Sequence, residues 1–346
     1  MSRAELRIDT DLFRANIRAV RDRIAPSELM VVLKDDAYGH GLRWAVEAAR
    51  GTGVEWYGSY DVRSGVEARR VLGDAGRIFA WVTSTDDEID DALRADIDLG
   101  VGSAEYLERI TARAAQAGVR ARIHLKIDTG LHRNGLLPAE WERTVDDVRA
   151  GERAGHLELA GIWSHLAEAS DDEDDAAQTL FLEAVRVAER SGPTPEALHL
   201  TASAASWWRP ELRGSVSRIG AFCYGVRSAD GPELPGIEPV AELTATVSEI
   251  VDGFARVDVG SFDGIPSTLA GAQVGTPAGS RELVRIEGTS SLVEGWPGMT
   301  IGEPVWLFGA GNHGESSATT LAERIDTVGE EILTRLTTRV RRVTTP

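Results

Sequence analysis

Lys34 stands at the end of an apolar run, in a position that suits chemistry. Residues Leu29–Lys34 have the composition of a buried strand, and the seven residues after them read Asp-Asp-Ala-Tyr-Gly-His-Gly. The C-terminal ends of parallel strands form the active sites of (β/α)8 barrels, where burial lowers the pKa of a lysine and makes it a Schiff-base nucleophile. An exposed lysine at a strand end is the alternative, and position alone favours it.

Polar side chains also follow later apolar runs. Arg133 lies in the run Lys-Ile-Asp-Thr-Gly-Leu-His-Arg-Asn-Gly at 126–135, and His165 follows a run that ends at Trp163. His165 is either a residue of the active site or a core histidine whose hydrogen bonds are satisfied, and the sequence supports the two interpretations equally. Barrels often bind phosphate with the loops after strands seven and eight, using backbone N–H groups and a hydroxyl. The residues of those loops are Ser203, Gly220 and Ala221.

A regular alternation of strands and helices must position these residues. From residue 29 to about 222, short β-rich runs alternate with amphipathic helical stretches, as in parallel βαβ units. Eight such strands predict an α/β fold with a (β/α)8 TIM-like barrel. Residues at helical spacing behind a Thr10/Asp11 cap predict a helix that leads into it. Those residues are Phe13, Ile17, Val20 and Ile24, and the expected strands are Leu29–Lys34, Trp56–Tyr60, Ile78–Val82, Asp98–Val101, Ala121–Ile127, Leu159–Trp163, Ala197–Thr201 and one near Arg218.

The sequence pattern changes after Gly225. Gly, Pro and Asp cluster as far as Gly236, and apolar and polar residues then alternate at period two from Ala241 to Val247. We therefore expect a barrel domain over 1–230, followed by a smaller, mainly β C-terminal domain over 231–346. Its further expected elements are strands at Ala255–Val259, Leu283–Glu287 and Val305–Phe308 and a helical segment at Glu330–Arg339.

Length and composition limit the class of protein. The 346 residues fit a barrel of roughly 200–250 residues with a smaller partner domain. A net charge of −18 without a Lys/Arg run argues against nucleic-acid binding. One cysteine, Cys223, excludes an intrachain disulfide framework and suits a reducing compartment. The sequence has no signal-peptide run and no stretch of about 20 apolar residues, so we expect a cytoplasmic protein without a membrane partner.

Competing chemistries have less support in the sequence. It contains no Gly-x-Gly-x-x-Gly at a strand-to-helix turn, no phosphate-loop Gly-Lys-Ser/Thr, no His-Glu-x-x-His and no Cys/His metal spacing. The acidic cluster Asp171–Asp175 could bind a cation, but a solvated helix start is favoured by roughly four to one. We therefore expect no metal site.

The motif at 34–41 closely resembles the cofactor-lysine signature of the alanine racemase family, whose members are pyridoxal 5′-phosphate (PLP) enzymes of fold type III. The resemblance recurs in order along nearly the whole chain. It implies that PLP is the cofactor, that Lys34 forms the internal aldimine and acts as the base on one face of the substrate Cα, and that Tyr38 helps to hold the cofactor phosphate. It also implies an isomerase of amino-acid metabolism that works as a homodimer, each barrel's site being completed by the β domain of the other chain.

Further roles follow from the same resemblance. Arg133 matches the arginine that touches the phenolic oxygen of PLP and the substrate carboxylate. Lys126 matches a lysine that is carbamylated in some members. An unmodified lysine or a structural ion pair is an equally good interpretation of Lys126. His165 matches a histidine beside the cofactor ring. Arg218 matches the arginine that faces the pyridine nitrogen, and since a guanidinium stays protonated it would donate to that nitrogen and weaken the ring as an electron sink. The phosphate corner is Ser203, Gly220 and Ala221.

The sequence departs from the family where the β domain meets the substrate. The family's second acid/base is a tyrosine in a Gly-Tyr-x-Asp-Gly stretch, and here the stretch at 260–264 is Gly-Ser-Phe-Asp-Gly, so Ser261 takes the catalytic position. An unassisted serine hydroxyl titrates too high to return a proton near neutral pH. The other departures are Asp35 in place of a small residue, Ala202 in place of an asparagine, Gly288-Thr289 in place of a Met-Asp pair and Glu330 in place of a phosphate-binding tyrosine.

Three hypotheses of function remain, all with a small amino acid as the ligand. The first is a divergent PLP enzyme that lacks the catalytic tyrosine and uses Lys34 as its only base, for decarboxylation, elimination, aldol-type cleavage or stereospecific exchange at Cα, so that lyase-type activity is open beside the family's isomerase activity. The second is an amino-acid racemase or epimerase with a replacement base such as His313 or Asp263. The third is a weakly catalytic PLP-binding protein, against which the full-length architecture counts.

Overall fold

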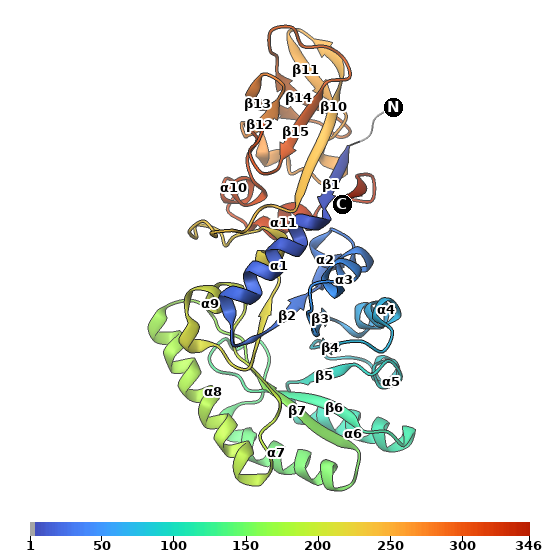
Figure 1. Ribbon diagram of the computed structural model, residues 1–346, viewed down its shortest axis with the longest axis vertical. Coiled ribbons are helices and arrows are strands. Elements are labelled where there is room, and N and C mark those ends of the chain that lie inside the picture. The colour runs from blue at the N-terminus through green and yellow to red at the C-terminus, as the bar shows by residue number, and fades with distance from the viewer. Residues whose placement is uncertain (1–3) are drawn as a thin grey trace. The chain divides into compact units, whose positions relative to one another are not determined.

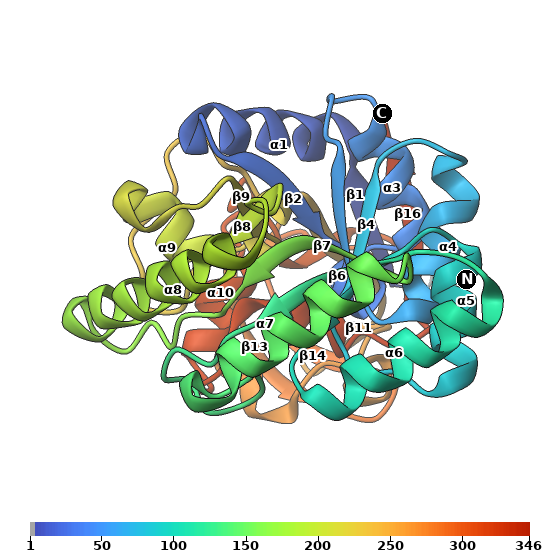
Figure 2. The ribbon, with the colours of Figure 1, turned by 90° about the horizontal axis from the view of Figure 1, so that it is seen from below.

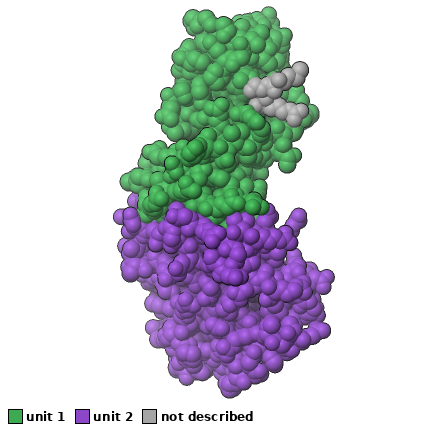
Figure 3. All heavy atoms as spheres, turned by 45° about the vertical axis from the view of Figure 1, so that its right-hand side comes forward, with its two compact units in different colours: residues 1–19, 35–48, 221–346 green, residues 20–34, 49–220 purple. Residues whose placement is uncertain are grey.

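The structure is a computed structural model that describes residues 4–346, and the chain forms two compact units. One unit, purple in Figure 3, comprises residues 20–34 and 49–220. The other, green in Figure 3, comprises residues 1–19, of which the first three are not described, together with 35–48 and 221–346. We call them the parallel unit and the antiparallel unit after their sheets.

The parallel unit contains one sheet of eight parallel strands in the order β8-β7-β6-β5-β4-β3-β2-β9. Strands β2 to β7 of this sheet are labelled in Figure 1. Seven of the strands follow one another in sequence order, which confirms the predicted run of βαβ units. Most of the strand residues are buried, as expected for a sheet that is covered on both faces. The strands are β2 (Glu28–Val32), β3 (Trp56–Tyr60), β4 (Arg77–Ala80), β5 (Asp98–Val101), β6 (Ala121–Lys126), β7 (Leu157–Trp163), β8 (Ala197–His199) and β9 (Val216–Ile219).

The two end strands of this sheet, β8 and β9, are joined by side-chain and backbone bonds. Leu198 N donates to Ser215 Oγ at 2.8 Å, and Ser215 Oγ donates to Glu196 O at 2.9 Å. Just beyond them, Arg218 N donates to Thr201 O at 3.3 Å. The sheet is therefore a near-barrel, in agreement with the predicted (β/α)8 architecture.

Helices connect the strands and begin where the sequence supplies caps. Thr85 and Glu88 form a capping box at α5 (Asp86–Arg94), and Ser103 caps α6 (Ala104–Ala117). Figure 2 shows α5, α6, α7 and α8 lying outside the strands. The remaining helices of this unit are α4 (Val62–Leu72), α7 (Pro138–Arg153), α8 (Asp171–Ser191), α9 (Ser203–Trp208) and the short η1 (Pro210–Leu212).

The acidic cluster Asp171–Asp175 forms the first turn of α8, as the sequence analysis favoured. Ser170 caps this helix, and the guanidinium of Arg209 pairs with Asp171 at 2.7 Å and Asp175 at 2.6 Å. Acidic groups stabilise the N-terminus of a helix through its dipole. Within residues 4–346, no group of three or more His, Cys, Asp or Glu side chains is arranged to hold a metal ion.

Helix α1 (Thr10–Ile24) leads into β2 as predicted, and all four of its expected core residues are fully buried. The expected cap was wrong by one residue. Asp9 Oδ1 accepts from Leu12 N at 2.8 Å, so the carboxylate before the helix satisfies the free N–H of its first turn. Both α1 and α3 (Leu42–Arg50) have residues in each unit.

The antiparallel unit is built on an eight-stranded sheet in the order β11-β14-β13-β12-β15-β10-β1-β16. Strand β1, near the start of the chain, pairs with β10 on one side and, in parallel, with β16 at the end of the chain. The sequence analysis missed β1, β12, β14 and β16. The strands are β1 (Glu5–Asp9), β10 (Ala241–Val251), β11 (Phe254–Val257), β12 (Gln273–Thr276), β13 (Gly279–Ile286), β14 (Ser291–Glu294), β15 (Pro304–Phe308) and β16 (Arg341–Thr345).

Short helices complete the antiparallel unit. The expected helix at Glu330–Arg339 is shorter than predicted, because α11 ends at Thr334 and the chain then turns towards β16. Among the described residues, no helix has both the length and the apolar content to cross a membrane. The division at residue 230 stays a prediction. The remaining short helices are η2 (Ala221–Tyr224), η3 (Ser261–Asp263), η4 (Ser267–Leu269), α10 (Ala318–Glu323) and α11 (Gly329–Thr334).

Candidate functional site

Lys34 follows one strand of the parallel unit, and Arg218 lies on the neighbouring strand. Strands β2 and β9 pair in parallel with Val31 opposite Ile219, so the chain beyond β2 and the chain beyond β9 leave the sheet side by side. Lys34 follows β2 by two residues and is half-buried, whereas Arg218 is 4% exposed. The two residues are separated by 184 positions in the sequence, and the sheet directs the chain after both strands to the same edge, where barrel sites form. Arg218 itself lies opposite Met30, four residues before Lys34.

The chain turns in an unusual way directly after Lys34. The segment labelled α2 (Lys34–Tyr38) includes four consecutive non-glycine residues, 35–38, with φ between +54° and +55°. This is a turn of left-handed helix, a conformation that costs an L-residue roughly 1–2 kcal/mol. It is fixed at both ends, because Asp36 Oδ1 accepts from Leu42 N at 2.7 Å and Gly39 O accepts from Arg342 Nε at 3.1 Å. Runs of strained backbone of this kind concentrate at functional sites.

The guanidinium of Arg218 is held almost entirely by protein acceptors. Nη1 donates to the backbone oxygen of His199 at 2.7 Å and to His199 Nδ1 at 3.0 Å. Nη2 donates to Ser164 O at 2.7 Å and has Leu200 O and His165 Nδ1 at 3.3 Å. The described residues provide no acceptor for the remaining N–H, on Nε. Burial lowers the pKa of Arg218 to about 9, although Glu168 opposes this shift.

His165 is a neutral imidazole in this environment. Burial lowers its pKa to about 3, and the positive charge of Arg218, followed by those of Arg133, Lys126 and Lys34, adds to the effect. Since a guanidinium only donates, the 3.3 Å contact from Arg218 to Nδ1 leaves the proton of His165 on Nε2. The ring of His165 thus lies within reach of the charges of Arg218, Arg133, Lys126 and Lys34, and as a neutral ring it is a poor proton acceptor.

Lys126 ends β6 and lies beside the indole of Trp163, with its Nζ 4.5 Å from the ring centroid. Burial lowers the pKa of Lys126 to about 8, helped by the charges of Arg133 and Arg218. Arg133 itself is exposed on the loop after β6. That loop is shaped by Asp128, whose Oδ1 accepts from the backbone N–H groups of Gly130 at 3.0 Å and His132 at 3.1 Å.

The composition of the chain sets these two lysines apart. Lys34 and Lys126 are its only lysines among 37 lysines and arginines. Arginine cannot lose its proton in a protein and so cannot act as an amine nucleophile. The only two side chains of the protein that can do so both lie in the candidate site, a signal that was present in the sequence and that the sequence analysis did not use.

The expected phosphate corner is partly assembled in the parallel unit. Ser203 opens α9, and its Oγ accepts from Gly220 N at 3.3 Å, so the loops after β8 and β9 meet there. Ala221 follows Gly220 and begins η2. Two backbone segments and one hydroxyl thus offer the donors that a phosphate group needs.

Two further predicted residues, Tyr38 and Ser261, belong to the antiparallel unit. Tyr38 is buried, its ring lies 4.9 Å from that of Tyr224, and burial, followed by the charge of Glu330, raises its pKa well above the usual value. Ser261 is exposed at the start of η3, beside Phe262, which is 63% exposed. An exposed serine without a neighbouring base has no means of activation.

The alternative bases considered for this unit are engaged elsewhere. Asp263 is buried, and its two oxygens accept from Gly260 N at 2.9 Å and from Arg339 Nε at 2.8 Å. The ring of His313 stacks on Trp306 with centroids 3.6 Å apart. Both side chains therefore have structural roles in the antiparallel unit.

The sequence analysis missed a group of buried polar residues in the strands themselves. Asp98 on β5, His124 on β6 and His199 on β8 are fully buried in the parallel unit and hydrogen-bonded in series. The available signal was an ionisable residue inside an otherwise apolar strand, which is rarely buried without a partner.

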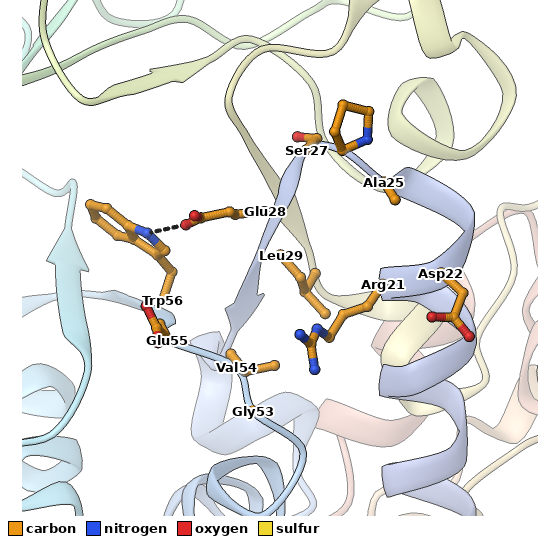
Figure 4. Close-up of a pocket in the computed structure, with 11 residues that line it drawn as sticks. Arg21, Asp22, Ala25, Ser27, Glu28, Leu29, Gly53, Val54, Glu55 and Trp56 are labelled. Atoms are coloured by element: carbon orange, nitrogen blue, oxygen red, sulfur yellow. Dashed lines mark hydrogen bonds between the residues drawn. The ribbon is translucent and has the colours of Figure 1, made fainter.

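A pocket of about 510 Å³ lies elsewhere in the parallel unit (Figure 4). It is lined by residues near the C-terminus of α1, among them Arg21, and by residues at the N-terminal ends of β2 and β3, among them Glu28 and Trp56. Trp56 Nε1 donates to Glu28 at 2.9 Å. Lys34 follows the opposite end of β2. The pocket is therefore not the candidate site, which the chemistry places at the C-terminal strand ends.

Comparisons with known proteins agree with this geometry. Residues 8–228 match the family model described as alanine racemase, N-terminal domain. The chain is 35% identical over 370 residues to the alanine racemase of Thermobifida fusca, covering 99% of this chain and 98% of that protein. For the alanine racemase of Beutenbergia cavernae the identity is 36% over 366 residues, with 97% and 96% covered. The crystal structure of the alanine racemase from Streptomyces lavendulae aligns with a TM-score of 0.94 at 32% identity, covering 100% and 98% of the two chains.

The matched proteins are barrel enzymes that use PLP, and the near-barrel with a lysine beyond its first strand and an arginine on its last agrees with that class. Within that class, the chain belongs to the alanine racemase family. The family's cofactor is PLP.

The residues present fit that cofactor. Lys34 supplies an amine at the strand ends. Ser203 supplies a hydroxyl donor for a phosphate, and its Oγ already accepts from Gly220 N. Arg218 keeps one N–H, on Nε, without an acceptor among the described residues, although its other donors are fully used. An unused donor on an almost completely buried guanidinium suits a ring nitrogen supplied by a ligand.

Proposed function

We propose that this protein is a PLP enzyme that acts at the Cα of a small amino acid with Lys34 as its only proton-transfer base. When bound, PLP withdraws electrons from Cα and so makes the proton there removable. The observation that carries the proposal is Arg218, whose Nε–H alone lacks an acceptor among the described residues. It lies on β9, the strand that pairs with β2, and Lys34 follows β2.

Each site residue has a defined task in this proposal. Lys34 holds the cofactor and accepts the Cα proton on one face. Arg218 donates to the ring nitrogen and keeps it unprotonated, because a guanidinium has no acceptor atom. Arg133 binds the substrate carboxylate, and neutral His165 borders the ring without taking a proton. The phosphate is held by Tyr38, Ser203, Gly220 and Ala221.

The proposal of a single base rests on Ser261. Inversion at Cα requires that a proton be removed on one face and returned on the other, and a serine hydroxyl without a base titrates too high for this task. Because the proton then leaves and returns on one face, the protein exchanges the Cα proton of one enantiomer with retention of configuration. Decarboxylation, elimination and aldol-type cleavage need only one base as well.

The second candidate function is racemisation of alanine with another proton donor. It is favoured by full-length identity of 35–36% to proteins named alanine racemase. Against it stand the engaged oxygens of Asp263, the stacking of His313 and the low pKa of His165.

One experiment tests the cofactor and the base together. The protein is loaded with PLP, reduced with borohydride and digested, and the modified lysine is located by mass spectrometry. With only two lysines in the chain the outcome is binary, and we expect Lys34. The unreduced protein is then incubated with L- or D-alanine in deuterium oxide. Exchange of one enantiomer with retention supports a single base, and rapid interconversion of the two enantiomers would establish the racemase alternative.

A further inference from the structure

Four buried polar side chains form a continuous hydrogen-bonded row inside the parallel unit. Arg218 Nη1 lies 3.0 Å from His199 Nδ1, His199 Nε2 lies 2.8 Å from His124 Nδ1, and His124 Nε2 lies 3.1 Å from Asp98 Oδ2. The exposed fraction is 4% for Arg218 and zero for the other three residues. We call this row the barrel relay.

The chemistry of the two ends fixes the position of every proton in the barrel relay. A guanidinium can only donate, so His199 Nδ1 accepts from Arg218 and His199 carries its proton on Nε2. That proton is donated to His124 Nδ1, so His124 also carries its proton on Nε2 and donates it to the Asp98 carboxylate. The three hydrogen bonds therefore run in one direction only, from Arg218 to Asp98, which is the final acceptor.

Both imidazoles are neutral, as this arrangement requires. Burial lowers the pKa of His199 well below its usual value, and the charge of Arg218 adds to this effect. Burial also lowers the pKa of His124, although the hydrogen bond to Asp98 opposes the shift. Hydrogen bonds that point the same way polarise one another, so the carboxylate strengthens each bond of the row.

Asp98 is kept ionised at the far end of the barrel relay. Burial would raise its pKa, but the bond from His124 and the charges of Arg77 and Arg122 outweigh burial and lower the pKa to about 2. Arg77 Nη2 donates to Oδ2 at 2.5 Å, and Arg122 Nε donates to Oδ1 at 2.6 Å. Both carboxylate oxygens are thus engaged by donors.

Aromatic side chains enclose the barrel relay. The ring of Phe79 lies 4.6 Å from that of His124 and 5.1 Å from that of His199, and the ring of Trp163 stacks parallel to His199 at 5.9 Å. Backbone on β7 also approaches closely, since a Cβ at Gly161 would lie 2.2 Å from His124 Nδ1. An apolar enclosure keeps water from replacing a bond of the row, and in it an unmatched donor is costly.

We propose that Asp98, His124 and His199 are positioning residues that hold Arg218 in one rotamer with its Nε–H presented to the cofactor ring. They act through Arg218 and touch no substrate. Their effect on the cofactor rests on the proposed function, whereas the direction of the hydrogen bonds does not. Asp98 and Arg218 belong to β5 and β9, which are four strands apart in the sheet order, so the barrel relay ties one side of the barrel to the other.

The first test measures the protons directly in the unmodified protein. We label the full-length protein with ¹⁵N-histidine and record the ring nitrogens by magic-angle-spinning NMR, with and without PLP, assigning the signals with His124→Gln and His199→Gln. We expect both rings to be neutral and protonated on Nε2, with a through-hydrogen-bond coupling between His199 Nε2 and His124 Nδ1. A proton on Nδ1 of either ring, or a doubly protonated ring, would overturn the proposal.

The second test cuts the barrel relay at Asp98 without changing its shape. In Asp98→Asn the amide nitrogen must face Arg122 in one orientation, or Arg77 and His124 in the other, so donor meets donor in both. The matched control is Asp96→Asn, because Asp96 pairs with the same Arg122 at 2.7 Å but is not part of the row. Asp96 has φ +53°, which asparagine tolerates.

The expected results separate a positioning role from a general structural one. In Asp98→Asn the ring signals of His199 change, the absorption maximum of bound PLP shifts and PLP binds about tenfold more weakly, because a buried donor is left unmatched. Asp96→Asn changes none of these. A folded Asp98→Asn protein with unaltered His199 signals and an unaltered PLP spectrum would refute the proposal. A protein that binds no PLP would refute the proposed function instead, and the ring NMR would still decide the direction of the bonds.

Discussion

Lys126 combines burial with two cationic neighbours, Arg133 and Arg218, and this has a chemical consequence at the scale of a single residue. Its pKa of about 8 is well below the usual value near 10.5 because burial, Arg133 and Arg218 all disfavour the charged form. A neutral amine reacts with carbon dioxide and an ammonium group does not. The carbamate that results is an anion and would interact favourably with the adjacent arginines.

We expect that Lys126 is carbamylated above pH 8 and free at pH 6. The measurement is ¹³C NMR of the PLP-loaded protein at a fixed concentration of dissolved ¹³C-labelled carbon dioxide. A carbamate signal should rise as the pH passes through about 8 and should be absent from Lys126→Arg, because arginine stays protonated. A signal that persists in this variant would assign the carbamate to another amine.

A second expectation concerns Ser261. If only the missing hydroxyl acid limits inversion, Ser261→Tyr should raise inversion of alanine by about 100-fold at most, the lower end of the range for general acid–base catalysis. The gain is limited because Phe262 adds bulk and because its ring lies against Gly288, where a Cβ would be 3.0 Å from it. Ser267→Tyr, at another exposed serine of the same unit, is the control.

Inversion is followed by circular dichroism of the alanine pool. Equal rates for wild type, Ser261→Tyr and Ser267→Tyr would show that the tyrosine position does not limit the reaction. In that case the proposal of a single base, as derived from Ser261, would have to be abandoned.

The left-handed turn after Lys34 is the feature with the clearest consequence at the scale of an element. Asp35 is exposed and has φ +54°, which glycine adopts freely and a β-branched residue does not. We expect Asp35→Gly to change the free energy of unfolding by less than about 1 kcal/mol, since relief of strain offsets the flexibility of glycine in the unfolded chain. Asp35→Val should lose about 2 kcal/mol or more.

Glu108, an exposed residue within α6, provides the matched control for the turn. In a right-handed helix the order of stability of the two variants reverses: the glycine variant is the less stable one, because glycine costs about 1 kcal/mol there and valine costs less. Denaturant unfolding of the four variants measures both pairs. If the glycine variant were less stable than the valine variant at Asp35 as well as at Glu108, the turn would not be left-handed in solution.

The elements of the parallel unit could be read from the sequence to within three residues because each strand is an apolar run between helices with clear caps. Four strands of the antiparallel unit, β1, β12, β14 and β16, could not be read from the sequence. Strand β16 has the sequence Arg-Arg-Val-Thr-Thr, and only its pairing with β1, more than 330 residues away, makes it a strand. Strands β12 and β14 are four residues long, too short to show a period.

The candidate site was predictable in its motifs but not in its contacts. Lys34, Arg133 and Arg218 were found because they stand in recognisable runs at strand ends. The bonds from Arg218 to His199 and onward to Asp98 depend on which strands become neighbours across the barrel. No local pattern carries that information, and a buried histidine in a strand is read as core unless the three-dimensional partner is known.

At the scale of the whole molecule, we expect a homodimer that depends on Phe262. The family resemblance places the loop at 260–264 in the barrel of a second chain, and Phe262 is 63% exposed on this loop. An exposed large apolar side chain beside a site residue is typical of a contact surface. Phe262→Asp should weaken self-association by about tenfold or more, as measured by sedimentation velocity at micromolar concentration.

The matched control for this variant is Ile301→Asp. Ile301 is 66% exposed in the same unit but lies far along the chain from Ser261. We expect it to leave self-association unchanged. A monomeric wild-type protein at micromolar concentration would contradict the prediction of a homodimer directly.

The pairing of β1 with β16 also determines how the protein bears a mechanical load. These two strands carry the two ends of the described chain, and they run parallel, with Glu5 opposite Arg341 and Asp9 opposite Thr345. A force that separates the ends pulls the two strands in opposite directions along their length. All hydrogen bonds of the pair then carry the force together instead of opening one after another, so the antiparallel unit resists stretching until the pair shears as a whole.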